Sequence, residues 1–222
     1  MATRLRLPSA TTAAVSPAPQ SYSHTLSPLT RRTLPTADAS ALETQAYRPD
    51  FADHLVAGDA LRFQFVSEQM AADMVFTSGD TLKFAIQGLE ESAGNNLAIQ
   101  CFVGVVNAAG DTAQATIRSK VSEGTELGTA LANRFLSTTL SGSYTTVAGD
   151  RLVVEISATG TPTNAISIQG HNASFRWGSD GASGDLPEND TETGTTFNPW
   201  IEFATTITFM PRPSQLTTLG AG

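Results

Sequence analysis

Three stretches of the chain share one pattern of hydrophobic and polar positions: VAGDALRFQF from Val56, TSGDTLKFAI from Thr77 and VAGDRLVVEI from Val147. Glycine reaches positive φ at low cost and aspartate bonds nearby backbone amides, so each Gly-Asp pair predicts a turn. Apolar and polar residues alternate after each turn, and this period of two predicts a strand with one buried face. The buried faces are expected to form one core from Leu61, Phe63, Leu82, Phe84, Leu152, Val154 and Ile156.

The polar residues of these stretches fall on the opposite face of each strand, which we expect to be solvated. The gaps between the three stretches are unequal, so they do not form a solenoid or propeller repeat. The pattern instead indicates one structural device used three times in an all-β domain. The expected solvated face carries Arg62, Gln64, Lys83, Gln87, Glu155 and Ser157.

Further stretches of the same kind are separated by turns at Gly79-Asp80, Gly94-Asn95, Gly110-Asp111 and Gly149-Asp150. The only plausible helix is EGTELGTALANRF, and its internal glycine weakens that interpretation. Many short strands with tight turns predict an all-β fold, a single antiparallel β-sandwich with a jelly-roll-like body. The expected strands lie near residues 60–66, 73–77, 81–89, 97–106, 113–121, 134–147, 151–157, 164–169, 172–177 and 200–210.

The first part of the chain, residues 1–48, has a different composition, rich in Ser, Thr, Ala and Pro. Proline disfavours helix and cannot donate to a strand ladder, so we expect an extended N-terminal arm. Such a segment buries too little apolar surface to order itself alone, although a piece such as TRLRLP could join a sheet edge. The expected organisation is an arm over residues 1–48 and a β-sandwich body over residues 49–222.

Charge is divided unevenly between these two parts. The formal net charge is −8, yet residues 1–48 hold five arginines against two acidic residues. A basic arm on an acidic body suggests that the arm contacts something negative, although five arginines in such a length are also ordinary. The candidates for contact with a partner are Arg4, Arg6, Arg31 and Arg32.

A long acidic segment, residues 177–200, does not fit a strand and is too long for a hairpin turn. Carboxylates within residues 178–192 could bind calcium, although their spacing fits no EF-hand loop and solvated clusters are more common. Paired carboxylates could also serve a glycosidase, and Trp177 and Trp200, which bracket the segment, could contact a glycan. The sequence leaves open whether this loop binds calcium or a glycan.

Motifs of enzymes and cofactor sites give no further candidates. The chain has no Gly-x-Gly-x-x-Gly, Walker A or Gly-x-Ser-x-Gly sequence, and His24, His54 and His171 lack a second ligand at zinc spacing. Cys101, the only cysteine, falls on the apolar face of LAIQCFVGVV and is expected to pack in the core. We therefore expect a non-enzyme with no catalytic residues, cofactor or metal.

Two further classes are not expected. No apolar run approaches the roughly 18 residues of a membrane span, and the proline-broken start does not resemble a signal peptide. No basic surface interleaved with aromatic residues indicates nucleic-acid binding. Charged residues make up 15% of the chain, which favours a stiff β-protein with a neutral surface.

Four segments together resemble small virion structural proteins of tailed bacteriophages and prophages. They are TRLRLPSA at residues 3–10, AAVSPAP at 13–19, GDRLVVEI at 149–156 and NPWIEF at 198–203. The resemblance runs from end to end and implies a β-sandwich protein of the particle, of the decoration or tail-associated type. It implies no catalytic residues.

This resemblance, with the predicted arm and body, leads to a capsid decoration (cement) protein as the first expectation. It would sit on the capsid surface of the virion, bind the major capsid protein or other virion proteins, and form a homo-oligomer, most simply a trimer. A tail, neck or fibre protein of the virion is the alternative within the same class. A carbohydrate-binding β-sandwich module is the alternative from another class, and neither nucleic acid nor membrane is an expected partner.

Overall fold

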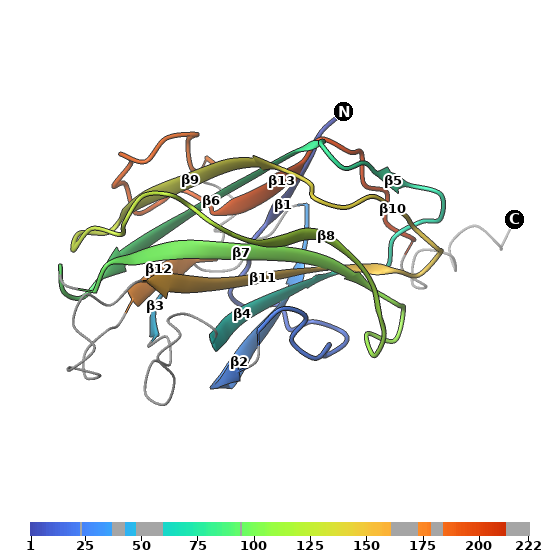
Figure 1. Cartoon of the computed structure of the whole chain (residues 1–222), viewed down its shortest axis with the longest axis horizontal. Helices are drawn as coiled ribbons and strands as arrows, with labels where there is room; N and C mark the ends of the chain where they lie inside the picture. The colour runs from blue at the N-terminus through green and yellow to red at the C-terminus, as the bar shows by residue number, and fades with distance from the viewer. Residues whose placement is uncertain are drawn as a thin grey trace, which may run out of the picture.

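The computed structural model is a two-layer β-sandwich without a helix among the residues it describes, which are 1–22, 24–36, 43–47, 60–93, 95–160, 173–178 and 184–211. Two large sheets, called here sheet A and sheet B, lie face to face, and a third, two-stranded sheet lies at one end (Figure 1). The predicted all-β sandwich is therefore confirmed.

Sheet A has six strands in the order β1-β13-β6-β12-β3, and β9 pairs with the other edge of β6. All of its pairings are antiparallel. The chain reaches this sheet from both of its ends, since β1 pairs with β13 with Thr3 opposite Phe203 and Arg6 opposite Trp200. Its strands are β1 (Thr3–Arg6), β3 (Glu43–Tyr47), β6 (Thr81–Glu90), β9 (Ala132–Thr139), β12 (Ala173–Trp177) and β13 (Trp200–Phe203).

Sheet B has five strands in the order β2-β4-β11-β7-β8. β2 runs parallel to β4, so the sandwich is not entirely antiparallel, and the other pairs of this sheet are antiparallel. The two-stranded sheet pairs β10 with β5. The strands of these two sheets are β2 (His24–Leu34), β4 (Ala60–Ser67), β5 (Val75–Phe76), β7 (Leu97–Val106), β8 (Ala113–Ser122), β10 (Tyr144–Thr145) and β11 (Arg151–Gly160).

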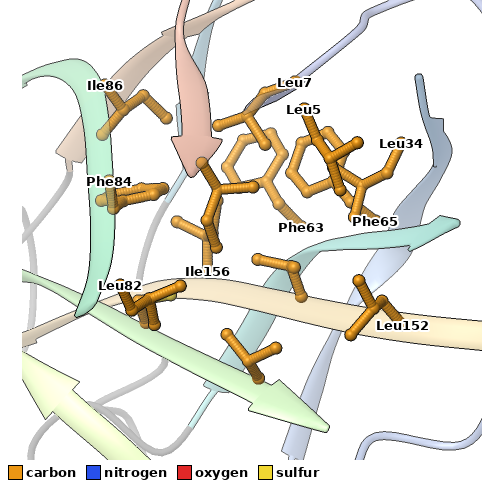
Figure 2. Packing of buried hydrophobic residues seen from close by; sticks show 14 of the residues in the cluster. Leu5, Leu7, Leu34, Phe63, Phe65, Leu82, Phe84, Ile86, Leu152 and Ile156 are labelled. Atoms are coloured by element: carbon orange, nitrogen blue, oxygen red, sulfur yellow. The ribbon is translucent and has the colours of Figure 1, made fainter. Parts of the chain in front are cut away.

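The main core lies between sheets A and B. Apolar residues of β6 face apolar residues of β4 and β11, and leucines from the first part of the chain fill the space beside them (Figure 2). Six of the predicted core residues belong to it, but Leu61 packs with Tyr22 and Phe102 in a separate cluster. The six are Phe63, Leu82, Phe84, Leu152, Val154 and Ile156.

The described residues of segment 1–48 lie within both sheets. β1 is a strand of sheet A and β2 a strand of sheet B, and Leu5, Leu7 and Leu34 are fully buried in the main core. The boundary expected between residues 48 and 49 lies outside the described residues. The described part of the segment gives strands to both sheets and leucines to the core of the same chain, while the division into an arm and a body stays a prediction.

The predicted Gly-Asp turns are present where the structure describes them. Gly79 and Gly149 have φ of 97° and 96°, and the amides of Asp80 and Asp150 bond the carbonyls three residues earlier. The Asp150 carboxylate also accepts a 2.8 Å bond from the amide of Val147. The third pair, at Gly58, lies outside the described residues.

Other boundaries differ from the sequence prediction. The stretch 134–147 divides into β9 and β10, β13 ends at Phe203, and the strand expected at 164–169 lies outside the described residues. The plausible helix is absent, because Leu127 is buried in the core with its amide bonded to the Leu97 carbonyl, and β9 begins at Ala132.

The expectation of a solvated outer face is wrong for the central strands. Gln64, Gln87, Glu155 and Ser157 are each at most 1% exposed. Sequence alternation assigns such residues to the face away from the core, but other parts of the same chain cover that face.

Candidate functional site

Residues 11–22, called here the N-terminal strap, cover the outer face of sheet B. Ala13 and Val15 pack against the outward side chains of Val66, Val106 and Val153. The amide of Thr33 bonds the Thr11 carbonyl at 2.9 Å, which ties the beginning of the strap to β2. The strap thus gives β4, β7 and β11 a second, smaller apolar layer.

A buried carboxylate holds the other end of the strap. One Glu155 oxygen accepts a 2.8 Å bond from the amide of Gln20, and the other accepts a 3.2 Å bond from the amide of Ser21. Gln64 Nε2 donates to the same carboxylate at 3.0 Å. Burial raises the pKa of Glu155, and these three bonds, with the charge of Lys120, act in the opposite direction.

Two of the partner-contact candidates, Arg31 and Arg32, contact the strap and the segment before it. Arg31 Nε donates to Gln64 Oε1 at 2.8 Å, and its Nη2 donates to the Pro17 carbonyl at 3.1 Å. Burial lowers the pKa of Arg31, although the Glu155 charge acts against this. Arg32 Nε donates to the Ser9 carbonyl. Both guanidinium groups therefore bond within the chain, and their contact with a partner stays a prediction.

The other two candidates, Arg4 and Arg6, lie in a cluster of charges on the outer face of sheet A. Arg4 Nε bonds Glu202 Oε2 at 2.9 Å, and its Nη1 lies 3.0 Å from Asp185 Oδ2. Arg6 Nη2 lies 2.9 Å from Asp185 Oδ1. Lys83 Nζ lies 2.9 Å from both carboxylate oxygens of Glu188.

This cluster bears on the charge asymmetry of the sequence. The basic residues at the beginning of the chain were expected to meet a negative partner, and the structure pairs Arg4 and Arg6 with the acidic segment and β13 of the same chain. Whether they also contact another molecule stays a prediction.

The acidic segment is fixed to sheet A mainly through polar groups of β6 and β9. Gln87 Nε2 donates to the Gly194 carbonyl at 3.0 Å, and Asn133 Nδ2 donates to the Pro187 carbonyl at 2.6 Å. The amide of Phe135 bonds Asp190 Oδ1 at 2.7 Å. Several carboxylates of the segment therefore form ion pairs or hydrogen bonds with sheet A of the same chain, and hydrogen bonds to its carbonyl groups hold its backbone in place.

The two tryptophans that bracket the segment are buried. Trp177 is 2% exposed and packs against Phe63 in the main core, while Trp200 is fully buried below the Arg4 guanidinium, which lies 3.7 Å from the ring centre. Sugar stacking needs an accessible ring face, so neither ring can provide the glycan contact considered from the sequence.

The remaining candidates from the sequence for reactive or metal-binding side chains are the cysteine and the histidines. Cys101 is 1% exposed in the core, as predicted, and burial raises the pKa of its thiol to about 12. His54 and His171 lie outside the described residues. Within the described part of the chain, no group of three or more His, Cys, Asp or Glu side chains could hold a metal ion. The same part contains no helix that could cross a membrane.

Sequence reasoning missed the polar cluster at Glu155. The available signal was weak: Glu155 and Gln64 each interrupt an apolar run, and they lie opposite each other in the β4–β11 register. Alternation alone assigned both to solvent, because the covering strap comes from far away in the chain.

Comparisons with known proteins do not assign the chain to a family. No protein-family model and no curated protein matches it. Similar solved structures include a CocE/NonD family hydrolase from Staphylococcus aureus, with a TM-score of 0.49 and 9% identity over 92% of this chain and 36% of the hydrolase. This chain thus spans about a third of the length of that hydrolase.

Two further similar structures are more distant. The Eiger TNF from S. frugiperda has a TM-score of 0.30 and 13% identity, over 80% of this chain and 92% of that one. VP2 of infectious bursal disease virus has a TM-score of 0.21 and 11% identity, over 83% of this chain and 45% of that one. At these TM-scores, none of the three carries an argument about what this chain does.

Proposed function

We propose that the chain is a structural protein of a tailed-bacteriophage virion, and specifically a capsid decoration protein that binds and stabilises the head lattice. Its partner would be the major capsid protein, and its place the outer surface of the head. The proposal begins from the sequence resemblance, and one structural observation supports it.

That observation is the arrangement of the four segments that resemble the virion proteins. The first and last of them form the β1–β13 pair, with Leu5 opposite Ile201. The other two also meet, since Val15 of the strap packs in the same cluster as Val153 of β11. Segments that are far apart in sequence therefore meet as two contacting pairs. The residues that carry the resemblance thus form long-range contacts that hold the sandwich together.

The contact between β1 and β13 would suit a lattice-binding protein, because it joins distant parts of the chain. Among the described strands, β1 is the first and β13 the last, and the two pair with each other. The Thr3 hydroxyl also accepts a 2.7 Å bond from the amide of Ile207, which follows β13. Local opening from either strand would disturb the other and the core below, so the ends of the sandwich resist separate unfolding. Such cooperativity would suit a protein that stabilises a particle.

The test is to find the chain in purified particles. Particles are prepared from a host that carries the gene, the protein content is quantified by mass spectrometry, and the chain is placed by electron microscopy of the particle. We expect a copy number comparable with that of the major capsid protein and density on the outside of the head.

The outcomes separate the alternatives. A copy number far below that of the capsid protein, with density at the tail, neck or fibre, would replace decoration by the other virion role. Particles that lack the chain altogether would reject the virion proposal. Particles from a host with the gene deleted are the matched control, and they should lose stability to heat if the chain is a cement protein.

A further inference from the structure

Two buried amide side chains lie opposite each other beneath the acidic segment. Gln87 of β6 and Asn133 of β9 form a cross-strand pair in sheet A, so their side chains share one face of that sheet. They are 1% and 0% exposed. Figure 1 shows the segment beside the same two strands. The pair therefore forms the part of sheet A that the segment covers.

The nitrogen atoms of both amides are bonded, but their oxygen atoms are not. Gln87 Nε2 donates to the Gly194 carbonyl at 3.0 Å, and Asn133 Nδ2 donates to the carbonyls of Pro187, at 2.6 Å, and of Asn189. Rotating either amide by half a turn would replace these bonds by contacts between oxygens, so the orientation of both is fixed. Among the described residues, Gln87 Oε1 and Asn133 Oδ1 accept no hydrogen bond although both atoms are buried. Because buried polar atoms are normally satisfied, these two oxygens indicate a bound group.

The segment above the two amides also carries two carboxylates without a cation. Asp185 and Glu188 form ion pairs with basic residues of β1 and β6. By contrast, Asp190 and Glu192 form no ion pair within the part of the chain that the structure describes. Each uses one oxygen to accept a bond from a backbone amide, at 2.7 Å and 2.6 Å respectively. Both belong to the stretch 187–194, whose carbonyls accept bonds from the two buried amides.

We propose that the oxygens of Gln87, Asn133, Asp190 and Glu192, called here the amide–carboxylate site, bind a calcium ion. Ca²⁺ takes roughly six to eight oxygen ligands from carboxylates, amide and backbone carbonyls and water, in flexible geometry. The two amide oxygens would supply neutral ligands, and the two carboxylates would supply the charge. A water molecule could donate to both amide oxygens, but it would leave the two carboxylates without a counter-ion. Mg²⁺ fits less well, because it requires near-ideal octahedral geometry and dehydrates reluctantly.

Two features limit the expected affinity. Only two of the side chains are acidic, and the described residues contain no group of three or more His, Cys, Asp or Glu side chains suited to a metal ion. Arg134 adds a positive charge nearby, since its Nη1 donates to the Asn133 carbonyl at 3.1 Å and to the Asp190 carbonyl at 3.4 Å. Affinity for Ca²⁺ depends on the number of charged ligands, so we expect a dissociation constant of about 10⁻⁴–10⁻³ M. Calcium binding goes beyond the proposed virion role and does not depend on it.

The test titrates the full chain with calcium chloride, and separately with magnesium chloride, by isothermal titration calorimetry at a fixed sodium chloride concentration. We expect one Ca²⁺ bound per chain, weaker binding of Mg²⁺, and a melting temperature that rises with the Ca²⁺ concentration. Hydrogen exchange should slow at the amides of Phe135 and Gly194, because these amides bond the two carboxylates of the site. This measurement locates the ion without a substitution.

Substitution of the carboxylates tests the site directly. Asp190→Asn and Glu192→Gln should each weaken Ca²⁺ binding by about tenfold, because each removes one of the two charged ligands. Both variants keep an oxygen that can accept the backbone bond, and thermal unfolding without Ca²⁺ checks that they fold. Glu188→Gln is the matched control, since it removes the same charge from the same segment at a carboxylate that is paired with Lys83. It should leave the affinity for Ca²⁺ nearly unchanged.

Other results overturn the proposal. If Ca²⁺ does not bind at concentrations well above the expected constant, water alone satisfies the amide oxygens. If neither site variant weakens binding, or if Glu188→Gln weakens it as much, the ion is attracted to the acidic segment in general and the amide–carboxylate site is wrong. Equal binding of Mg²⁺ rejects the choice of calcium. Slower exchange at other amides, with Phe135 and Gly194 unchanged, places the ion elsewhere on the chain.

Discussion

The outer face of each sheet is covered by another part of the chain, the acidic segment on sheet A and the strap on sheet B. The polar contacts on the two faces differ in their access to water. On sheet A, the side chains of Arg4 and Arg6 are 30% and 22% exposed while they pair with carboxylates. On sheet B, Glu155 is fully buried, and its carboxylate bonds the strap through backbone amides and Gln64.

This difference shows two ways in which a covering segment can be attached to a sheet. Partly exposed ion pairs gain little, because water and salt screen the charges and long side chains lose entropy. Replacing every partner of a buried polar contact by apolar groups can be nearly neutral, but removing the carboxylate alone leaves its buried donors without an acceptor and costs stability. We therefore expect the sheet A contacts to tolerate substitution and the sheet B contact to be sensitive to it.

The largest expected effect comes from the core that both faces share. Phe84 is 2% exposed between the sheets, and Phe84→Ala should lower the free energy of unfolding by about 3–5 kcal/mol, the usual loss for an emptied aromatic site. Chemical denaturation measures this value. An unchanged free energy of unfolding would show that Phe84 is not packed as described. The costs of substitutions on the two faces could then no longer be compared with the cost of a core substitution.

The next largest effect should come from the buried contact on sheet B. Glu155→Ala removes the acceptor of the Gln20 and Ser21 amides and of Gln64, and should cost about 2–3 kcal/mol. Hydrogen exchange should show faster exchange of these two amides in particular. Glu155→Gln keeps an oxygen acceptor of nearly the same shape, so it should cost less than the alanine variant. Equal costs for both would contradict a role for the acceptor oxygens.

A smaller effect is expected on sheet A. Arg4→Ala removes ion pairs to Asp185 and Glu202 and a contact with the Trp200 ring, and should cost about 1 kcal/mol at low salt. The difference from wild type should shrink as salt is added, which denaturation at two ionic strengths would detect. If Arg4→Ala lowered the free energy of unfolding as much as Glu155→Ala and the loss did not change with salt, the contrast between the two faces would be wrong.

The smallest effect concerns pH and sharpens the comparison at Glu155. Because burial raises the pKa of this carboxyl in the folded state, the folded chain holds its proton at pH values where the unfolded chain has lost it. Its contribution to stability is therefore fully present below the ordinary carboxyl pKa of 4.5 and is lost as pH rises through the raised value. Compared with Glu155→Gln, wild type should lose stability across that window and then remain level.

Denaturation of wild type and Glu155→Gln at a series of pH values from acid to neutral gives this difference in stability. The contributions of the other carboxyl groups largely cancel, because both proteins contain them. A difference that grows in favour of wild type as pH rises would mean that the amide bonds to Glu155 outweigh its burial. Glu202→Gln on the outer face of sheet A is the matched control, since that carboxylate remains partly exposed.

Local patterns in the sequence determined the strands and turns of the body. Alternation in TLKFAI and RLVVEI is enough to direct Phe84 and Val154 to one core, because adjacent side chains of a strand point to opposite faces. The Gly79 and Gly149 turns were equally predictable, since positive φ favours glycine. These are short-range properties, and neighbouring residues suffice to set them.

Tertiary structure decided what covers the other face of each sheet. Glu155 and Gln87 lie at positions that alternation assigns to water, but the strap and the acidic segment bury them. Ser21, which bonds Glu155, lies 134 positions away in the chain, and Glu192, which bonds Gln87, lies 105 positions away. The placement of Leu5 in the core, and the pairing of Arg4 with Asp185, likewise depend on β1 lying beside β13. No local pattern specifies such contacts, because they arise only when the whole chain has chosen one arrangement that buries its apolar surface and satisfies its polar groups together.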